Sequence, residues 1–391
     1  MSSAVPRRVL PLIVFSQFAG TSLWFATNAV MPDLQHAWGL PATAVGTLTS
    51  AVQMGFVAGT LAFALLMVAD RFSPSRVFMA CAPVGALANA ATLWAGGSFS
   101  LLLGLRFVVG FLLAGIYPVG MKLAASWYRQ GLGAAMGVLI GALILGTALP
   151  HGLRALAGDG GSSVLPSWKS VLLGVSLLAA AGGVLTGLGV PDSPWLQRGA
   201  RVTPAALRLI WHDRKLRASV FGYCGHMWEI YTFFVLVPLI VGMRWTGLAQ
   251  SAASFFIIGA GFIGCVAGGL LVRRWGSANV AQRQLATSGL CCLLAPLMLQ
   301  APDALFLAWL LLWGLTVAGD SPQFSTLTAQ NAPPAVVGSV LTFVNCIGFA
   351  ISVLSIEIFV AALPRVPLAV LLPLLGLGPL LGLWMFRPLS R

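Results

Sequence analysis

Two stretches of the sequence resemble one another closely. Residues 110–118 read Gly-Phe-Leu-Leu-Ala-Gly-Ile-Tyr-Pro, and residues 314–322 read Gly-Leu-Thr-Val-Ala-Gly-Asp-Ser-Pro. Four residues are identical at an offset of 204 positions, and the same offset relates Trp24 to Trp228. An offset that is shared by two separate places predicts that the chain contains two copies of one structural unit.

Both stretches lie inside long apolar runs. The chain has 391 residues, of which 58% are apolar and only 8% are charged, whereas a soluble globular protein carries about 25% charged residues. This composition excludes soluble enzymes, disordered proteins and nucleic-acid-binding proteins. A membrane-spanning helix needs about 20 mostly apolar residues. Such runs recur twelve times, near 9–31, 43–68, 76–96, 99–127, 132–157, 169–190, 218–241, 249–272, 284–301, 304–329, 336–361 and 366–386.

The longest connection between these runs divides the chain into two halves of six spans. It covers residues 191–217 and is rich in Pro and Arg. We therefore expect an N-terminal six-helix bundle over 1–190, a basic cytoplasmic linker over 191–217 and a C-terminal six-helix bundle over 218–391. The predicted fold is an all-α integral membrane protein with twelve transmembrane helices in two pseudo-symmetric bundles. Such repeats are the usual construction of secondary transporters.

The basic residues predict the orientation in the membrane. With the N-terminus inside, sixteen Lys and Arg residues fall in cytoplasmic connections and four in outer connections. Cytoplasmic loops carry the excess of Lys and Arg in membrane proteins. We therefore expect a multi-pass protein of the bacterial inner membrane with both termini in the cytoplasm. The lipid bilayer accounts for the net charge of +13, so no acidic partner is needed.

Twelve spans in two repeats with a basic central loop resemble the Major Facilitator Superfamily over the whole chain. Residues 70–76 read Asp-Arg-Phe-Ser-Pro-Ser-Arg, which is similar to that family's cytoplasmic gate motif, Gly-x-x-x-Asp-Arg-x-Gly-Arg-Arg. Leu66 stands in place of the first Gly, and Ser-Pro replaces the Gly-Arg step. The resemblance implies that Asp70, Arg71 and Arg76 latch an inner gate.

Other motifs of the family are present only in part. Arg106-x-x-x-Gly110 resembles the family's Arg motif in the fourth span. The fifth span lacks the Gly-Pro pair of the family's antiporter motif, which favours uptake over export. Spans two and eight contain no Arg, so the anion site of the family's nitrate porters is not carried over.

Six ionisable side chains in the predicted spans, where insertion costs roughly 2.5–3.5 kcal/mol each, are candidates for a functional role. They are Arg106 and Lys122 in span four, His226 and Glu229 in span seven, Asp320 in span ten and Glu357 in span eleven. The family resemblance implies that spans one, four, seven and ten line a central cavity. At about 1.5 Å of rise per residue, Tyr117, His226, Glu229 and Asp320 fall in one polar layer on the cytoplasmic side of the midplane.

The chemistry of this layer favours proton coupling. A carboxyl group away from water favours its neutral form, and His titrates near neutral pH. Asp320, Glu229 and His226 are therefore the proton-coupling candidates, and the first half lacks such carboxylates. The alternatives are a structural His226–Asp320 lock and a helix-to-helix hydrogen bond of Glu229.

Neutral polar and aromatic residues are the candidates for solute binding. Gln17, Trp24 and Asn28 share one face of span one at helical spacing, and Trp24 and Trp228 are candidates for opposed aromatic walls. The full candidate set is Tyr117, Arg106, Gln17, Trp24, Asn28, Trp228, Gln323 and Asn345. Ordinary helix packing is the alternative, as is a bracing role for Arg106 and an interfacial position for Lys122.

The sequence thus predicts a secondary active transporter that moves a small solute by alternating access and is coupled to protons. Arg106 and Lys122, opposite the carboxylates, favour an organic anion or a zwitterion. No phosphate-binding loop, metal motif or intramembrane protease motif is present, so we expect a protein without a cofactor or metal that is not an enzyme. We also expect a monomer. The alternatives are a proton-driven drug or metabolite efflux antiporter, a copper importer using Cys224, His226, Met227 and Cys265, a passive channel, and a non-transporting receptor or sensor.

Overall fold

The computed structural model describes residues 6–128, 132–157, 167–196 and 202–389, and every regular element in these residues is helical. Arg129, Arg198, Arg201 and Arg391, which the orientation count uses, lie outside the described residues. The α-helices are α1 (Val9–Thr21), α2 (Ala26–Ala29), α3 (Met31–Trp38), α4 (Ala44–Leu65), α5 (Val68–Arg71), α6 (Pro74–Ala91), α7 (Phe99–Leu113), α8 (Tyr117–Trp127), α9 (Leu132–Ala157), α10 (Ser167–Gly189), α11 (Ala205–His212), α12 (Arg214–Gly242), α13 (Gly247–Met298), α14 (Asp303–Gly319), α15 (Ser321–Asn331), α16 (Val337–Ala362), α17 (Leu368–Leu375) and α18 (Leu377–Phe386).

These helices give the predicted number of membrane crossings within the described residues. Ten continuous helical segments are long and apolar enough to span a membrane. One of them, α13, is two spans joined at Gly276, whose φ of 75° lies in the left-handed region that favours glycine. The chain from α1 to α3 forms the remaining crossing. The predicted fold class is therefore confirmed.

The structure differs from the sequence prediction in two places near the predicted linker. The predicted linker contains a helix, α11, instead of only loop. The seventh span begins at Arg214 rather than at residue 218, because the Asp213 side chain accepts a hydrogen bond from the amide of Leu216 at 2.7 Å and caps the helix.

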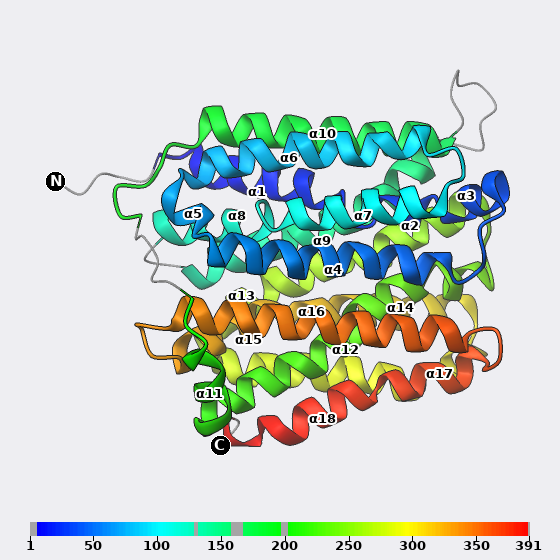
Figure 1. The fold of residues 1–391 in the computed structure, drawn as a ribbon. Coiled ribbons are helices and arrows are strands. Elements are labelled where there is room, and N and C mark those ends of the chain that lie inside the picture. Colours follow the sequence, from blue (N-terminus) through cyan, green and yellow to red (C-terminus); the bar gives the residue numbers. More distant parts are fainter. Residues whose placement is uncertain (1–5, 129–131, 158–166, 197–201, 390–391) are drawn as a thin grey trace.

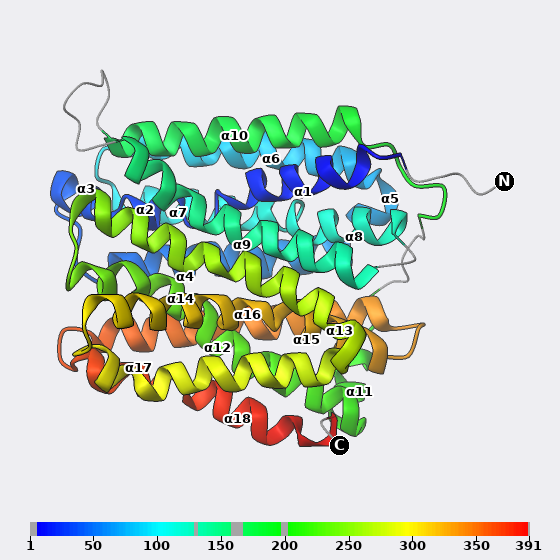
Figure 2. The same ribbon diagram turned by 180° about the vertical axis from the view of Figure 1, so that it is seen from behind.

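The helices of the first half, α1 to α10, lie together on one side of the molecule, and α12 to α18 lie on the other (Figures 1 and 2). The two groups meet where α9 packs on α13 and where α4 packs on α16. The start of α1 and the end of α18 lie at the same end of the molecule (Figure 1).

Close helix contacts recur at equivalent places in both halves. A β-carbon on Gly110 would lie 1.9 Å from the carbonyl oxygen of Val52, and one on Gly314 would lie 1.9 Å from that of Ile257. Each glycine thus brings the fourth helix of its half into backbone contact with the second. Small residues are the usual means of such packing in membranes, and this repeated geometry agrees with the duplication seen in the sequence.

The fourth span of each half is broken at the same position of the repeat. Span four is interrupted between α7 and α8, where Ile116 is the N-cap residue, and span ten is interrupted at Asp320, the N-cap of α15. Pro118 and Pro322 follow at the start of the second helix, where the missing amide hydrogen is least costly. The break places the Asp320 side chain in the middle of a spanning segment.

Arg106 supports another break, between α1 and α2. Its Nη2 donates hydrogen bonds to the carbonyl oxygens of Leu23 and Trp24 at 2.9 and 2.6 Å. Its Nη1 donates to Oδ1 of Asn89 at 3.0 Å, and the Asn89 amide donates to Ser176. The buried guanidinium therefore links the first, third, fourth and sixth spans.

We predict that Gly110→Ala and Gly314→Ala destabilise the protein by about 3 kcal/mol or prevent folding, because the new methyl group forces two helices apart. Gly104→Ala is the matched control on the same helix as Gly110, since a β-carbon there has no neighbour within 4 Å. It is expected to be neutral or to stabilise by about 0.5–1 kcal/mol. Thermal unfolding in detergent measures all three; equal stability of the Gly110 and Gly104 variants would contradict the close contact.

We predict that Arg106→Lys lowers the free energy of unfolding by about 3 kcal/mol. A lysine ammonium lacks the planar, forked arrangement of N–H donors that lets Arg106 bond two backbone carbonyls and Asn89 at the same time. Arg365→Lys, at an exposed arginine, is the control and should leave Tm unchanged. An Arg106→Lys protein with the wild-type Tm would instead indicate that Arg106 serves to contact solute.

Candidate functional site

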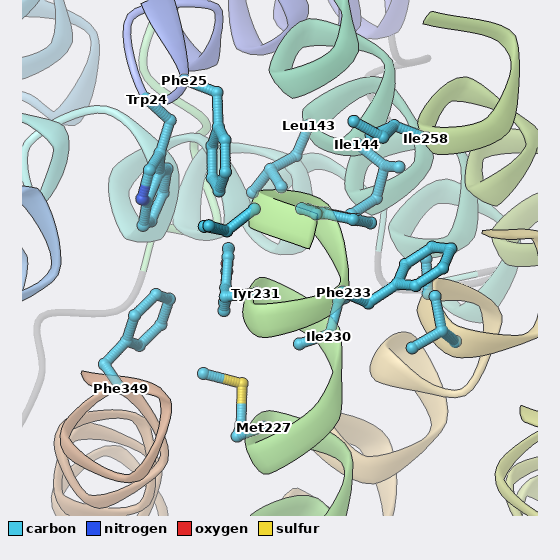
Figure 3. Packing of buried hydrophobic residues seen from close by; sticks show 14 of the residues in the cluster. Trp24, Phe25, Leu143, Ile144, Met227, Ile230, Tyr231, Phe233, Ile258 and Phe349 are labelled. Atoms are coloured by element: carbon cyan, nitrogen blue, oxygen red, sulfur yellow. The ribbon is translucent and has the colours of Figure 1, made fainter. Parts of the chain in front are cut away.

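Five aromatic side chains meet between the two halves and are at most 7% exposed. This aromatic cluster consists of Trp24, Phe56 and Tyr117 from the first half and Tyr231 and Phe349 from the second. Figure 3 shows Trp24 opposite Tyr231 of α12 and Phe349 of α16. The cluster closes the centre of the molecule in this conformation.

The Trp24 ring plane is nearly parallel to those of Tyr231 and Phe349 across the interface, whereas Phe56 is tilted by 53° to Phe349. Trp24 lies 5.8 Å from Tyr231 with an interplanar angle of 19°, and 5.4 Å from Phe349 with an angle of 20°. Phe56 lies 4.4 Å from Phe349 and 6.1 Å from Tyr117. Tyr117 thus belongs to the aromatic cluster.

Trp228 is not the ring that faces Trp24. It packs edge-on against Phe359 at 6.0 Å and lines an apolar groove with residues of α16 and α18. Tyr231, one helical turn further along α12, faces Trp24 instead. The offset that relates the two tryptophans therefore does not place them as opposed walls.

His226 and Asp320 form a buried pair inside the second half. Nδ1 of His226 lies 2.7 Å from Oδ1 of Asp320, and the two side chains are 1% and 0% exposed. Nε2 of His226 and Oδ2 of Asp320 have no hydrogen-bond partner among the described residues. The His226 ring lies between Tyr223 and Phe324, with each centroid 5.9 Å away. The structure therefore brings together two of the three proton-coupling candidates.

Glu229 has other neighbours. Its Oε1 accepts hydrogen bonds from Trp313 Nε1 at 2.7 Å and from the Cys292 thiol at 3.2 Å, and its Oε2 accepts one from Ser288 at 2.8 Å. These partners lie on α13 and α14, whereas His226 contacts Asp320 at the start of α15. The predicted polar layer is thus divided into an aromatic part with Tyr117, the His226–Asp320 pair and the Glu229 network.

The polar candidates of span one have different environments. Asn28 donates a hydrogen bond to Thr49 at 2.8 Å. Gln17 is buried against α8, because a β-carbon on Gly120 would lie 2.1 Å from its Oε1. The Gln17 amide and Nε1 of Trp24 have no hydrogen-bond partner in the described part of the chain.

The two candidates in the second half lie on α15 and α16. Gln323 is 3% exposed and lies near Gly268 of α13. Asn345 accepts a hydrogen bond from the Tyr223 hydroxyl at 3.1 Å. Tyr223 therefore links Asn345 to the stacked His226 ring.

Both basic candidates of span four already have protein partners. Arg106 holds the break in span one, and the Lys122 ammonium pairs with the Asp70 carboxylate while donating to the carbonyl of Ala69 at 2.8 Å. Lys122 therefore links α8 to α5 through this ion pair. The partners of Arg106 are all neutral groups, and its Nε has no hydrogen-bond partner among the described residues.

The gate-motif residues differ in exposure. Asp70 of α5 pairs with Lys122 of α8, whereas the Arg71 and Arg76 side chains are exposed. At the opposite end of this half, Arg154 of α9 pairs with Asp33 of α3 and donates to the carbonyl of Ala29 at 3.0 Å. The first half therefore has an ion pair near each end.

Some residues of the site carry no signal in the sequence. Phe56, Tyr231 and Phe349 lie in apolar runs where aromatic residues are common, so only the packing reveals them. His151 could have been identified by the test for ionisable residues in spans, because it lies in the predicted fifth span and is 2% exposed in α9.

In the described residues no group of three or more His, Cys, Asp or Glu side chains is arranged to hold a metal ion. The cysteines Cys81, Cys224, Cys265, Cys291, Cys292 and Cys346 are free thiols. The arrangement around His226 thus offers proton transfer.

Comparison with known proteins agrees with this architecture. A family model described as Major Facilitator Superfamily matches residues 13–356. The probable transporter SCO4007 of Streptomyces coelicolor is 28% identical over 346 residues, which is 85% of this chain and 77% of that protein.

Two solved structures share the fold at 16% sequence identity. The crystal structure of the human organic anion transporter MFSD10 (TETRAN) has a TM-score of 0.74 and covers 97% of this chain and 99% of its own. The crystal structure of a variant of the Escherichia coli fucose:proton symporter FucP has a TM-score of 0.67 and covers 98% of each chain. The family model, which spans most of the sequence, establishes that this chain belongs to the Major Facilitator Superfamily.

Proposed function

We propose that this protein is a proton-coupled secondary active transporter that takes up a small organic solute by alternating access. The observation that carries the proposal is the contact of 2.7 Å between His226 and Asp320, both almost fully buried at a break in a spanning helix. Ionisable groups inside a membrane protein are costly and mark ion or substrate pathways. Their free atoms, Nε2 and Oδ2, can take part in proton transfer.

The charge of this pair couples protonation to closure. With neutral His226 and ionised Asp320, the pair has a net charge of −1, and one added proton makes it neutral. Burying a net charge in a low-dielectric interior is expensive, so the closed arrangement favours the proton-loaded pair. Separation of the two halves admits water, which stabilises the charged form and permits the proton to leave.

Glu229 is a weaker candidate for the mobile proton. Three donors already contact its two oxygens, and each of these hydrogen bonds favours the ionised form. Asp320 has one side-chain partner, His226, and an Oδ2 without a hydrogen bond among the described residues. We therefore assign the transported proton to the His226–Asp320 pair and a supporting role to Glu229.

The solved relatives support the general type of function. One is described as a fucose:proton symporter and the other as an organic anion transporter, so this fold serves chemically different solutes. At 16% sequence identity, these structures do not indicate which solute this chain transports. An efflux antiporter remains the second candidate, because the same buried pair serves exchange as well as symport.

We propose further that residues 1–190 and 218–391 are the two bundles that move against each other. As part of the same proposal, the protein is a monomer of the bacterial inner membrane with both termini in the cytoplasm. The start of α1 and the end of α18 lie at the same end of the molecule (Figure 1), which supports a common side of the membrane for both termini.

We predict that Asp320→Asn abolishes uptake driven by a pH gradient, because the amide cannot bind and release the proton. Glu229→Gln should reduce uptake by less than about tenfold, since its ionised form already has three donors. Glu357→Gln, at a partly exposed carboxylate on α16, is the matched control and should transport normally. The assay uses proteoliposomes and a ligand first found by a thermal-shift screen of sugars, amino acids, carboxylates and aromatic amides.

Exchange of labelled for unlabelled ligand across proteoliposomes without a pH gradient is the second readout. Asp320→Asn should retain exchange if the protein is folded and only the coupling is lost. Full gradient-driven uptake by both Asp320→Asn and Glu229→Gln would overturn the proposal, and solute flux through wild type that ignores pH would indicate a passive channel.

A further inference from the structure

The aromatic cluster has two faces that belong to different halves of the molecule. Trp24 is held by the break in the first span, which Arg106 fixes through the carbonyls of Leu23 and Trp24. Tyr231 and Phe349 belong to α12 and α16 of the second half. Movement of one half against the other therefore separates these ring faces without breaking a covalent or hydrogen-bonded link between them.

The geometry of the facing rings limits what can fit between them. The Trp24 plane makes angles of only 19° and 20° with Tyr231 and Phe349. Tyr231 and Phe349 are inclined to each other by 39°, so each presents its own nearly parallel face to Trp24. Movement of the halves apart opens a slot between Trp24 and these faces, and aromatic rings attract one another in offset-stacked arrangements. A flat ring fits such a slot, whereas a saturated ring is thicker and lacks the π-system.

Unpaired polar atoms lie beside this slot. Nε1 of Trp24 is buried and has no hydrogen-bond partner in the described residues, and the same is true of both amide atoms of Gln53. Gln53 precedes Phe56 by three positions and therefore shares its face of α4. A buried polar group without a partner is expensive, and a ligand with neutral hydrogen-bonding groups would satisfy these atoms.

The charged side chains of the neighbouring helices have protein partners. Arg106 donates to Leu23, Trp24 and Asn89, Lys122 pairs with Asp70, and His226 contacts Asp320. The partners of Arg106 are neutral, and its Nε has no hydrogen-bond partner among the described residues. The unpaired atoms that accompany the rings, Nε1 of Trp24 and the Gln53 amide, are neutral, so recognition at the cluster depends on ring stacking and on neutral hydrogen bonds.

We infer that the transported solute carries a flat aromatic ring with uncharged hydrogen-bonding groups, and that it binds between Trp24 on one side and Tyr231 and Phe349 on the other. This inference rests on the proposed function and adds the class of solute. In the closed protein the rings contact one another, and the solute replaces these contacts when the halves separate. Gln53 and Nε1 of Trp24 orient the solute through its polar groups.

The test uses matched pairs of probes on the purified full-length protein. Benzamide, nicotinamide and indole-3-carboxamide are compared with cyclohexanecarboxamide, which keeps the amide and replaces the aromatic ring. Glucose, alanine and benzoate complete the panel. We expect at least one aromatic amide to raise Tm more than the saturated amide at the same concentration.

Variants locate the binding. Tyr231→Leu and Phe349→Leu should each weaken the affinity about 10-fold, since each removes one stacking face, whereas Tyr231→Phe should retain it. Gln53→Leu should weaken the affinity of amides without abolishing the preference for aromatic rings. Phe256→Leu, on the exposed surface of α13 with 63% exposure, is the matched control and should bind as wild type. Tm without ligand identifies any variant that fails to fold.

The inference is overturned if cyclohexanecarboxamide binds as well as the aromatic amides, if only glucose, alanine or benzoate binds, or if no aromatic amide binds. It is also overturned if Tyr231→Leu and Phe349→Leu both fold and bind normally. Failure of the proposed function gives a different result, because an aromatic ligand would then bind with the expected variant pattern but would not cross proteoliposomes.

Discussion

The need to satisfy polar groups within hydrocarbon shapes this structure more than any other constraint. A continuous helix satisfies its own backbone, but a broken helix does not, and broken helices persist only where the protein supplies partners. Arg106 supplies them at the break between α1 and α2. Trp24 lies in that break, Tyr117 starts the helix after the break in span four, and Asp320 lies in the break in span ten. The side chains with the most distinctive chemistry are thus positioned where the spans are interrupted.

The two halves keep the same skeleton and differ in chemistry. Gly110 and Gly314 make the same close helix contact, and Ile116 and Asp320 occupy the same N-cap position after equivalent breaks. In the first half this position packs against Gly20. In the second half it holds a carboxylate against His226. The sequence predicts that the titratable groups lie in the second half. This difference follows from the exchange of Ile116 for Asp320 at equivalent positions of the two repeats.

The spans, the repeat and the family could be predicted because apolar length and small-residue spacing are local properties of the sequence. The pairing of His226 with Asp320 could also be predicted, since the rise per residue of a helix places both at a similar depth. The identity of the ring that faces Trp24 could not be predicted, because it depends on how the two halves pack against each other. Tyr231 and Trp228 are three residues apart, and only the rotation of α12 decides which of them faces the interface. The roles of Arg106 and Lys122 were likewise not predictable, since their partners include backbone carbonyls and the α5 carboxylate of Asp70, which are far away in the sequence.

The central claim is that the His226–Asp320 pair takes up and releases a proton. Infrared difference spectroscopy during a pH titration tests this directly, because a protonated carboxyl group has a carbonyl band that an ionised one lacks. The measurement needs no knowledge of the solute. We expect a carboxyl band that disappears as pH rises in wild type and in Glu357→Gln and that is missing from Asp320→Asn. The same band with the same titration in Asp320→Asn would show that another carboxyl group binds the proton.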